Sequence, residues 1–354
     1  TLPGFDKSKV QIYAGERGFE TMLRNEEIQV IISATPSKVH TEQGVAIAEA
    51  GKNLLIEKPL ALSIPECNIL IDAFRRADKQ LGVIFQLRYN PEIRALKRLI
   101  QEGNFGEIGM GHILVQKGRD ERYWTKKEWF GVQAEGGDAV SNQSIHQLDN
   151  MLYLVCFEQI DSVFALCQIL DRNRPVADPS WRSKDATDSA AALFKLNNGG
   201  WITAHMSTAE NKHAEHRNNI QSISLTSTGS NNYIKLGGEK TDQFEVINLE
   251  RIWYKAYYDE DGEVRFLPEK ETPPATWRKK GLPDPYLLFS HYREIAEFLD
   301  CVARDRRFPL DGIEAKKSLS LVIAIYESAV NQQEIKLADV FENKVGRSVQ
   351  DYLL

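Results

Sequence analysis

The stretch Leu54-Leu55-Ile56-Glu57-Lys58-Pro59 decides how the rest of the chain is interpreted. A short apolar run of strand length ends here in two opposite charges and a proline. If the run is a buried strand, Lys58 lies at its carboxyl end, which is the edge where open α/β sheets bind ligands. A Lys-Pro pair by itself is more typical of a surface turn, so the flanking sequence has to decide.

The flanking sequence predicts a βαβ unit. Residues 28–34 form a second apolar run of strand length, which Thr35-Pro36-Ser37 closes. A helix is expected over 38–50, because Gly51 stands where helix C-termini favour glycine. Strand, helix and strand within about 30 residues make a βαβ unit, whose crossover is almost always right-handed.

Later segments extend this pattern. Residues 86–91 (Gln-Leu-Arg-Tyr-Asn-Pro) follow the next predicted strand, and Glu135-Gly136-Gly137 precedes a predicted helix that contains 142–149 (Asn-Gln-Ser-Ile-His-Gln-Leu-Asp). Another helix is expected from Asp311-Gly312 to Ser328. Together with Ala34-Thr35-Pro36, His40 and Glu57-Lys58-Pro59, these segments resemble the Gfo/Idh/MocA family of NAD(P)-dependent oxidoreductases. The resemblance covers nearly the whole chain, with the motifs in the family's order.

The resemblance implies an α/β fold in which a Rossmann-type parallel sheet is followed by an α+β domain with a large, mainly antiparallel sheet. We expect a dinucleotide-binding domain over 1–105 and a domain for substrate binding and oligomerisation over 106–354. Two amphipathic helices, 287–304 and 313–330, should pack back near the first domain, and 277–285 should be a loop. After residue 107, strands are predicted over 108–116, 160–170, 190–196, 201–206, 221–228 and 244–249.

One face of this second sheet should be free to pair with another subunit, because antiparallel sheets commonly cover only one face with helices. The family resemblance implies a homodimer or homotetramer built on that face.

The opening of the chain departs from the family pattern, which calls for a first strand, a Gly-rich phosphate loop and a helix. No G-x-G-x-x-G occurs in the sequence, and only about 30 residues precede the first predicted strand. We therefore expect the first βαβ element, roughly 35–45 residues, to be missing from this chain. Backbone N–H groups and a helix N-terminus in that element normally hold the pyrophosphate.

The composition is that of an ordinary globular protein and argues against several classes. The 354 residues suffice for two domains, with 42% apolar and 27% charged residues. A formal net charge of −6 without a Lys/Arg cluster argues against a nucleic-acid partner or an anionic membrane surface. No apolar run has the length of a membrane-spanning helix. The four cysteines form no C-x-x-C pair and are interpreted as small buried residues. We expect a cytoplasmic protein, with export left open because the amino terminus is expected to be incomplete.

Asn142, His146 and Asp149 are predicted to share one face of a helix, because they are spaced at i, i+4 and i+7. On spacing alone, a solvated polar face is the more common explanation. The preceding Gly136-Gly137 favours a functional one, since paired glycines let the backbone approach a ligand closely. The family resemblance then implies that Lys58 and His146 form the catalytic pair.

The expected chemistry is oxidation of a secondary alcohol, in which a hydride leaves carbon and a proton leaves oxygen. His146 titrates near neutral pH and can accept that proton, and Lys58 can orient the alcohol and stabilise developing negative charge. Asn142 stands where many family members have Asp; an amide cannot titrate, so it can only orient a hydroxyl or the ring. Asp149 would raise the pKa of His146 if it approached the imidazole, whereas burial and Lys58 should lower it, and we expect lowering to prevail.

The remaining site predictions concern the cofactor, the substrate and metals. Residues expected to contact NAD or NADP are Thr35, Pro36, Ser37, His40, Glu57, Lys58, Gln86 and Arg88. Residues expected to contact the substrate are Lys58, Tyr89, Asn142 and His146, although Arg88 and Tyr89 could instead form a strand-to-helix cap. No metal is expected, because His213-Ala214-Glu215-His216 lacks a third ligand at a recognisable spacing and more readily forms a substrate-facing loop.

These features predict an oxidoreductase that transfers a hydride between NAD or NADP and a secondary hydroxyl or ketone of a sugar, cyclitol or nucleotide-sugar. The alternative is a non-catalytic binding or regulatory protein with the same fold that has lost dinucleotide binding. The missing Gly-rich element and Asn142 support that alternative.

Overall fold

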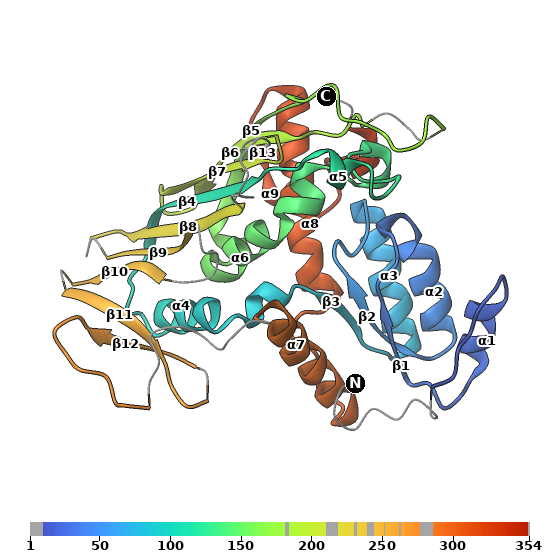
Figure 1. The fold of residues 1–354 in the computed structure, drawn as a ribbon, viewed down its shortest axis with the longest axis horizontal. Coiled ribbons are helices and arrows are strands. Elements are labelled where there is room, and N and C mark those ends of the chain that lie inside the picture. The colour runs from blue at the N-terminus through green and yellow to red at the C-terminus, as the bar shows by residue number, and fades with distance from the viewer. Residues whose placement is uncertain are drawn as a thin grey trace.

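The computed structural model describes residues 10–180, 184–209, 219–229, 232–238, 244–250, 252–261, 263–276 and 286–352. Within these residues the chain forms a three-stranded parallel sheet and a ten-stranded mixed sheet. Helix α8 (Gly312–Asn331) runs between the two sheets (Figure 1). The histidines at 213 and 216 and the predicted loop at 277–285 lie outside the described residues.

The small sheet confirms the predicted βαβ unit. Its order is β1 (Val30–Ser33), β2 (Asn53–Glu57) and β3 (Leu81–Ile84), and both pairings are parallel. The connections are formed by η2 (Ser37–Val39) with α2 (His40–Glu49), and by α3 (Ile64–Ala77). The continuous apolar run of β2 is explained by burial on both faces, since Leu54, Leu55 and Ile56 are all buried. A further short helix, α1 (Gly18–Arg24), precedes β1.

Helix α3 begins at a side-chain cap. Ser63 Oγ accepts a hydrogen bond from Glu66 N at 3.3 Å, and Glu66 Oε2 accepts one from Leu62 N at 3.1 Å. The first bond satisfies an N–H group that the first helical turn leaves without an intrahelical partner, and the second fixes the residue just before the cap.

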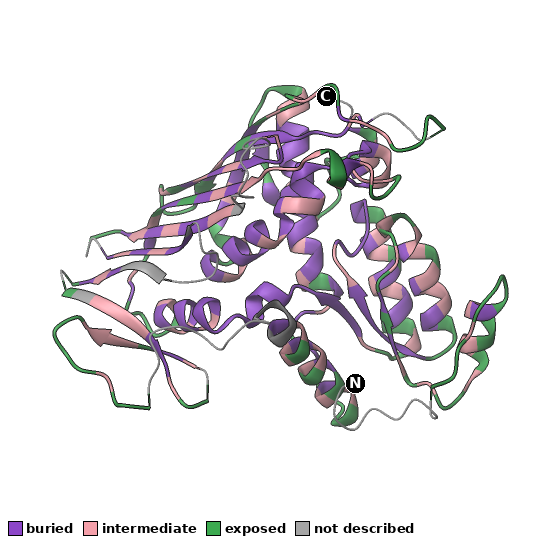
Figure 2. Ribbon diagram, in the orientation of Figure 1, coloured by how far each residue is buried: buried purple, intermediate pink, exposed green. Residues whose placement is uncertain are grey.

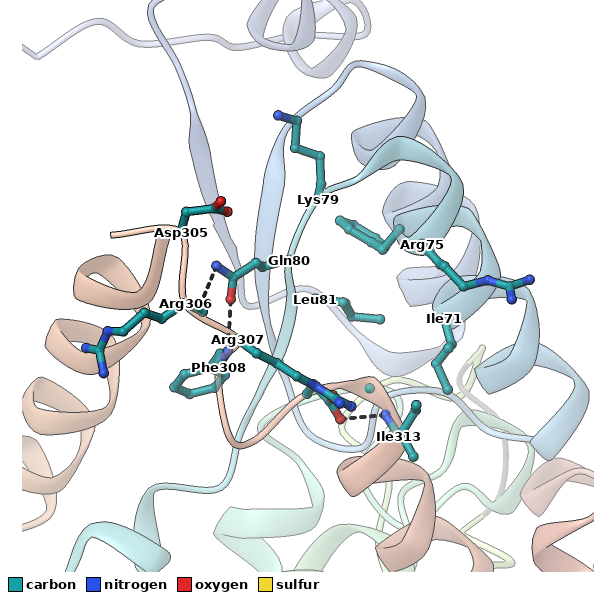
Figure 3. A pocket seen from close by; sticks show the side chains of 13 residues that line it. Ile71, Arg75, Lys79, Gln80, Leu81, Asp305, Arg306, Arg307, Phe308 and Ile313 are labelled. Carbon is teal, nitrogen blue, oxygen red and sulfur yellow. Dashed lines mark hydrogen bonds and ion pairs between the residues drawn. The ribbon is translucent and has the colours of Figure 1, made fainter. Parts of the chain in front are cut away.

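The outer edge of β3 is covered by the segment that joins α7 (Tyr286–Ala303) to α8. Val83 N donates to Leu310 O at 3.0 Å, and the side chain of Gln80 donates to Arg306 O and accepts from Phe308 N (Figure 3). A pocket of about 430 Å³ opens beside these residues, at the amino end of β3. Its arginines are paired with carboxylates, in the pairs Arg75–Asp72, Arg306–Asp300 and Arg307–Asp311.

Gly82 lies where α7 packs against β3. A Cβ on Gly82 would come within 2.8 Å of the Phe298 ring and 2.9 Å of Leu55, so this close packing requires a residue without a side chain.

The large sheet has the order β12-β11-β10-β9-β8-β4-β7-β6-β5-β13, and among its described pairings β4–β7 is parallel and the rest are antiparallel. The strands predicted from the sequence are β4 (Ile108–Lys117), β5 (Ile160–Gln168), β6 (Ser189–Leu196), β7 (Trp201–Ser207), β8 (Asn219–Ser227) and β10 (Phe244–Leu249). The sequence prediction missed β9 (Tyr233–Gly238), β11 (Ile252–Tyr258), β12 (Val264–Pro268) and β13 (Ile335–Lys336).

Helices α6 (Ile145–Val155) and α8 cover one face of this sheet, and α8 also contacts α3 and β3 of the small sheet. The expectation that α8 is amphipathic is therefore wrong: it is buried on nearly every side (Figure 2). Short helical segments complete the fold: η3 (Gln86–Tyr89), α4 (Pro91–Gln101), α5 (Glu121–Trp124), η4 (Gln133–Glu135), η5 (Ala139–Ser144), η6 (Phe157–Gln159), α9 (Leu337–Phe341) and η7 (Val349–Asp351).

The opposite face of the large sheet exposes apolar side chains. Phe164 and Leu166 on β5, Met110 on β4 and Trp201 on β7 are each more than 40% exposed.

In the described part of the chain, no helix combines the length and the apolar character needed to cross a membrane. The four cysteines are free, and Cys156 is exposed, which corrects the expectation that all four are buried.

Candidate active site

Three of the predicted site segments meet at the carboxyl edge of the small sheet. Parallel strands end at the same edge, so Thr35 after β1, Lys58 after β2 and Gln86 after β3 form a row. His40 is buried between the first two: its Nδ1 lies 2.9 Å from Pro59 O and its Nε2 lies 3.0 Å from Thr35 O. The imidazole thus ties together the two loops that follow β1 and β2.

The polar side chains after β1 are linked to one another. Thr35 Oγ1 lies 3.0 Å from Ser33 Oγ and donates to Gln43 Oε1 at 3.0 Å. Pro36 is extended, and η2 begins with Ser37. Lys38 then forms an ion pair of 2.7 Å with Glu135, which joins this loop to the second domain.

Lys58 reaches from the small sheet to the segment before α6. Its Nζ donates to Asn142 O at 2.7 Å and to Asn142 Oδ1 at 3.1 Å. Burial lowers the pKa of Lys58 to about 8, although the charges of Glu57 and Asp138 act to raise it. The ammonium group is therefore held in one place and loses its proton more readily than an ordinary lysine.

The segment that carries Asn142 is a π-helix, not part of one regular α-helix as predicted. The π-helical residues are Ala139–Ser144, and α6 begins at Ile145, so Asn142 and His146 lie on successive but different helical turns. Asp138 begins the π-helix: it accepts hydrogen bonds from Val140 N at 2.8 Å and Ser141 N at 2.6 Å. It also accepts the hydroxyl of Tyr326 from α8.

The structure gives Gly136 and Gly137 a role different from the one expected. Gly136 has a φ of +70°, and a Cβ on Gly137 would lie 2.2 Å from Trp129 O. The close approach is thus to the chain's own backbone around residues 129–132.

His146 is half-buried in the first turn of α6, with its ring 6.0 Å from the Phe85 ring in an edge-on arrangement. Its Nδ1 is buried and has no hydrogen-bond partner among the described residues. Burial lowers the pKa of His146 well below its usual value, and the nearby charges of Lys58, Lys117 and His291 lower it further. The imidazole is therefore neutral at pH 7 and can accept a proton.

Asp149 has partners other than His146. Its two oxygens accept hydrogen bonds from Arg88 Nε and Nη2, both at 2.7 Å, and Oδ1 also accepts one from Ser318 at 2.6 Å. Arg88 in turn lies 3.0 Å from Glu314 of α8 and stacks over the ring of Tyr153. The Arg88–Asp149 pair is buried and links η3, α6 and α8.

Tyr89 lies on the other side of η3, in the apolar core next to α7. Burial raises the pKa of its hydroxyl, and Glu297 and Glu294 raise it further. Glu294 is itself buried, accepts a hydrogen bond from Phe85 N at 2.9 Å, and has its pKa raised well above the usual range by burial.

Three residues that contact Gln143, namely Lys117, Arg119 and Tyr123, were not singled out from the sequence. Lys117 Nζ donates to Gln143 O at 2.5 Å, Arg119 Nη2 donates to Gln143 Oε1 at 2.5 Å, and Gln143 Nε2 donates to Tyr123 OH at 2.8 Å. Lys117 is the last residue of β4 and Arg119 follows the strand, and no motif in the sequence signals that this strand end meets the π-helix.

The residues at the strand ends fit the nicotinamide end of a dinucleotide. Gln86 Oε1 is buried without a hydrogen-bond partner among the described residues, so it offers an acceptor to a carboxamide or a ribose hydroxyl. Thr35 and Glu57 lie on the same edge and add a hydroxyl and a carboxylate. In the part of the chain that the structure describes, no group of three His, Cys, Asp or Glu side chains is placed to hold a metal.

Comparison with known proteins identifies the family. A family model described as an oxidoreductase family with an NAD-binding Rossmann fold matches residues 5–85, and a model of the GFO/IDH/MocA C-terminal domain matches residues 93–226. Together the two models match more than half of the chain.

The chain belongs to the Gfo/Idh/MocA family. Levoglucosan dehydrogenase of Pseudarthrobacter phenanthrenivorans is 26% identical over 247 residues, which cover 64% of this chain and 60% of that protein. The chain spans about half the length of the curated relatives it matches.

Solved structures of two dehydrogenases share the fold. Levoglucosan dehydrogenase in complex with NADH aligns with a TM-score of 0.73 at 22% identity, and covers 90% of this chain and 82% of that one. WlbA dehydrogenase from Bordetella pertussis, in complex with NADH and UDP-GlcNAcA, aligns with a TM-score of 0.67 at 22% identity and the same coverage. These likenesses confirm the predicted fold class: a Rossmann-like parallel sheet followed by a larger mixed sheet.

Proposed function

We propose that this Gfo/Idh/MocA protein is a nicotinamide-dependent oxidoreductase that acts on a secondary hydroxyl or ketone of a sugar, cyclitol or nucleotide-sugar. The observation that carries the proposal is the placement of Lys58 Nζ on Asn142, one helical turn before a neutral His146. An ammonium group and a neutral imidazole at the carboxyl edge of a parallel sheet supply what alcohol oxidation requires.

In this proposal each side chain has a separate task. Lys58 holds the substrate hydroxyl and stabilises the negative charge that develops on its oxygen. His146 takes the hydroxyl proton, and Asn142 fixes the direction of the lysine through its carbonyl and amide oxygens. NAD or NADP, when bound, supplies the acceptor for the hydride.

Of the cofactor contacts predicted from the sequence, we keep Thr35, Pro36, Ser37, Glu57, Lys58 and Gln86, and we give His40 and Arg88 supporting roles instead. Thr35, Pro36, Ser37, Glu57 and Gln86 line the edge where the nicotinamide end would lie, and His40 holds two of these loops together. Arg88 and Tyr89 are engaged with Asp149, Glu314 and α7, so we propose that they support η3 beneath the site.

We further propose that the exposed apolar face of the large sheet pairs with a second copy of the chain. The face presents Met110, Phe164, Leu166 and Trp201, and a shallow cavity of about 350 Å³ lies among β4, β5, β6 and β7. Exposed apolar surface of this kind, on the sheet face opposite to the covering helices, is typical of a subunit interface.

The test of cofactor binding is calorimetric titration of the full-length gene product with NADH and NADPH. We expect a dissociation constant in the micromolar range for one of them, about −8 kcal/mol. Gln86→Leu should weaken that binding, because it removes the buried unpaired acceptor. No heat with either dinucleotide would contradict the proposal and favour a non-catalytic binding or regulatory protein.

A further inference from the structure

Two histidines are close neighbours on the exposed face of the large sheet. His112 on β4 lies opposite Thr203 on β7 in the parallel register, and its Nδ1 is 2.8 Å from Thr203 Oγ1. His205 follows two residues later on β7, so both imidazoles project from the same face. With strands about 4.8 Å apart and a rise of about 3.3 Å per residue, their Cα atoms are about 8 Å apart.

The surroundings of this histidine pair are apolar. Both histidines line the cavity of about 350 Å³ on this face, together with Phe164, Leu166 and Leu193. Among the described residues that line the cavity, the two imidazoles are the groups that can take up a proton near neutral pH. Protonation of either one would therefore place a charge within the exposed apolar surface.

The single chain already disfavours the charged form of His112. Burial lowers the pKa of His112, and the charge of His205 lowers it further. The lysines on this face are further away: Lys235 lies two strands from His112 on β9, and Lys195 lies on β6, four residues after the residue opposite His205. Lys195 is paired with Glu334 at 3.0 Å. The centre of the face is thus uncharged when both imidazoles are neutral.

This distribution of charge suits a second copy of the chain. An isologous interface brings the same patch of both copies together, so any charge at its centre meets the same charge on the partner. The neutral histidine pair avoids that repulsion. At the β5–β13 edge, the ion pairs Lys195–Glu334 and Lys336–Asp161 supply charges of both signs. An apolar centre with a polar rim is the usual anatomy of a protein interface.

We propose that protonation of His112 and His205 controls the pairing of two copies through this face, so that the dimer forms at neutral pH and dissociates in mild acid. The inference rests on the proposed pairing of the large sheets and states how that pairing is regulated. Pairing removes the imidazoles from water, which lowers their pKa below that in the free chain. The dimer is therefore fully stable above the pKa of the free chain and weakens as the pH falls below it.

The test is the dimer dissociation constant of the full-length protein, measured by analytical ultracentrifugation between pH 8 and pH 5. Each imidazole that must lose its proton before pairing raises this constant by about tenfold per pH unit below its pKa. One histidine contributes two imidazoles to a dimer. We expect a rise of at least about tenfold between pH 7 and pH 5, over a range in which circular dichroism shows an unchanged fold.

Variants of the histidine pair should remove the pH dependence. The double variant His112→Gln with His205→Gln stays neutral, so its dissociation constant should change by less than about threefold between pH 7 and pH 5. His112→Lys should separate the copies already at pH 7, because an ammonium group is charged throughout this range. The matched control is Ile69→Lys, which adds the same charge at an exposed apolar position of α3, outside the large sheet, and should keep wild-type association.

The outcomes separate pH control from pairing itself. A dimer whose dissociation constant stays the same from pH 8 to pH 5 would overturn the pH control and leave the interface intact. An equal rise in acid for the double variant would overturn the assignment to His112 and His205. A wild-type protein that is monomeric at every pH would overturn the interface and with it the pH control.

Discussion

Burial lowers the pKa of both Lys58 and His146, and these two shifts predict a bell-shaped pH profile. The pKa of His146 lies well below its usual value, so kcat/KM for oxidation should rise with pH on the acidic side and be flat by pH 7. The pKa of Lys58 is about 8, so the rate should fall above that pH as the ammonium loses its proton. Initial rates across the pH range measure both limbs.

The two limbs can be assigned separately. His146→Ala should remove the acidic limb, and Lys58→Arg, if it keeps residual activity, should move the alkaline limb to higher pH because the guanidinium stays protonated. An acidic limb that survives in His146→Ala would place the base on another residue, most directly on Lys58.

The Arg88–Asp149 pair should matter for stability and not for the titration of His146. Asp149→Asn leaves a buried guanidinium without its bidentate partner, and we expect the free energy of unfolding to fall by about 3–5 kcal/mol. Glu314→Gln is the matched control, because Glu314 is the more exposed partner of the same arginine and should cost about 1 kcal/mol or less. Denaturant unfolding measures both, and a shift of the acidic limb in Asp149→Asn would contradict this placement.

At the residue scale, the sequence indicates candidate site residues but not which side chains they contact. Lys58 and His146 were proposed as the catalytic pair from the family resemblance, and both stand at the ends of elements that are readable in the chain. The partner of Asp149 could not be predicted, because Arg88 and Ser318 reach it from elements 61 and 169 residues away. Lys117 and Arg119 were missed for the same reason: they reach the site through hydrogen bonds to Gln143, which is 26 and 24 residues away.

At the element scale, the π-helix is the element that holds Lys58 in place, through Asn142. Asp138 caps it and also raises the pKa of Lys58 by its charge. Asp138→Asn should therefore lower the pKa of Lys58 and move the alkaline limb of the pH profile to lower pH. We also expect a loss of stability of about 1–3 kcal/mol, because buried hydrogen bonds are weakened.

Removing a helix cap outside the site separates the electrostatic effect of Asp138 on Lys58 from the loss of stability. Ser63→Ala removes the cap of α3 and should cost about 1 kcal/mol of stability. It should leave the alkaline limb where it is. If both variants moved the limb equally, Asp138 would act only through stability.

The elements that the sequence did predict are those with a clear period and clear ends. The buried run of β2 and the glycine after α2 mark one βαβ unit, and the structure has it. The π-helix was not predicted, because its residues fit a regular helical period equally well and its altered geometry depends on Asp138 and Tyr326. The two-residue strand β13 is too short to show any alternation.

At the scale of the whole molecule, the exposed face of the large sheet should hold two copies together. Leu166→Glu would place a charge in the proposed interface, and we expect the protein to shift to a monomer in light scattering after size-exclusion chromatography. Ile69→Glu is the control, because Ile69 is a similarly exposed apolar residue on α3, which does not belong to the large sheet. A monomeric wild-type protein would contradict the interface.

The overall arrangement was predicted from the order of the motifs, whereas the burial of α8 was not. Its sequence shows an apolar stripe with polar positions between, but both sheets pack against it, and residues such as Ser318, Ser320 and Ser328 are buried too. Those hydroxyls donate to Asp149, to Lys316 O and to Gln333 O, and these are contacts that the pattern of one helix cannot reveal.

The most direct test of the central claim is hydride transfer by Lys58→Met in the full-length protein. With NAD or NADP and an accepted sugar or cyclitol, the wild type should produce the absorbance of the reduced nicotinamide. The variant should lose at least about a hundredfold in kcat, while calorimetry shows that it still binds NADH. Full turnover in Lys58→Met would contradict the account.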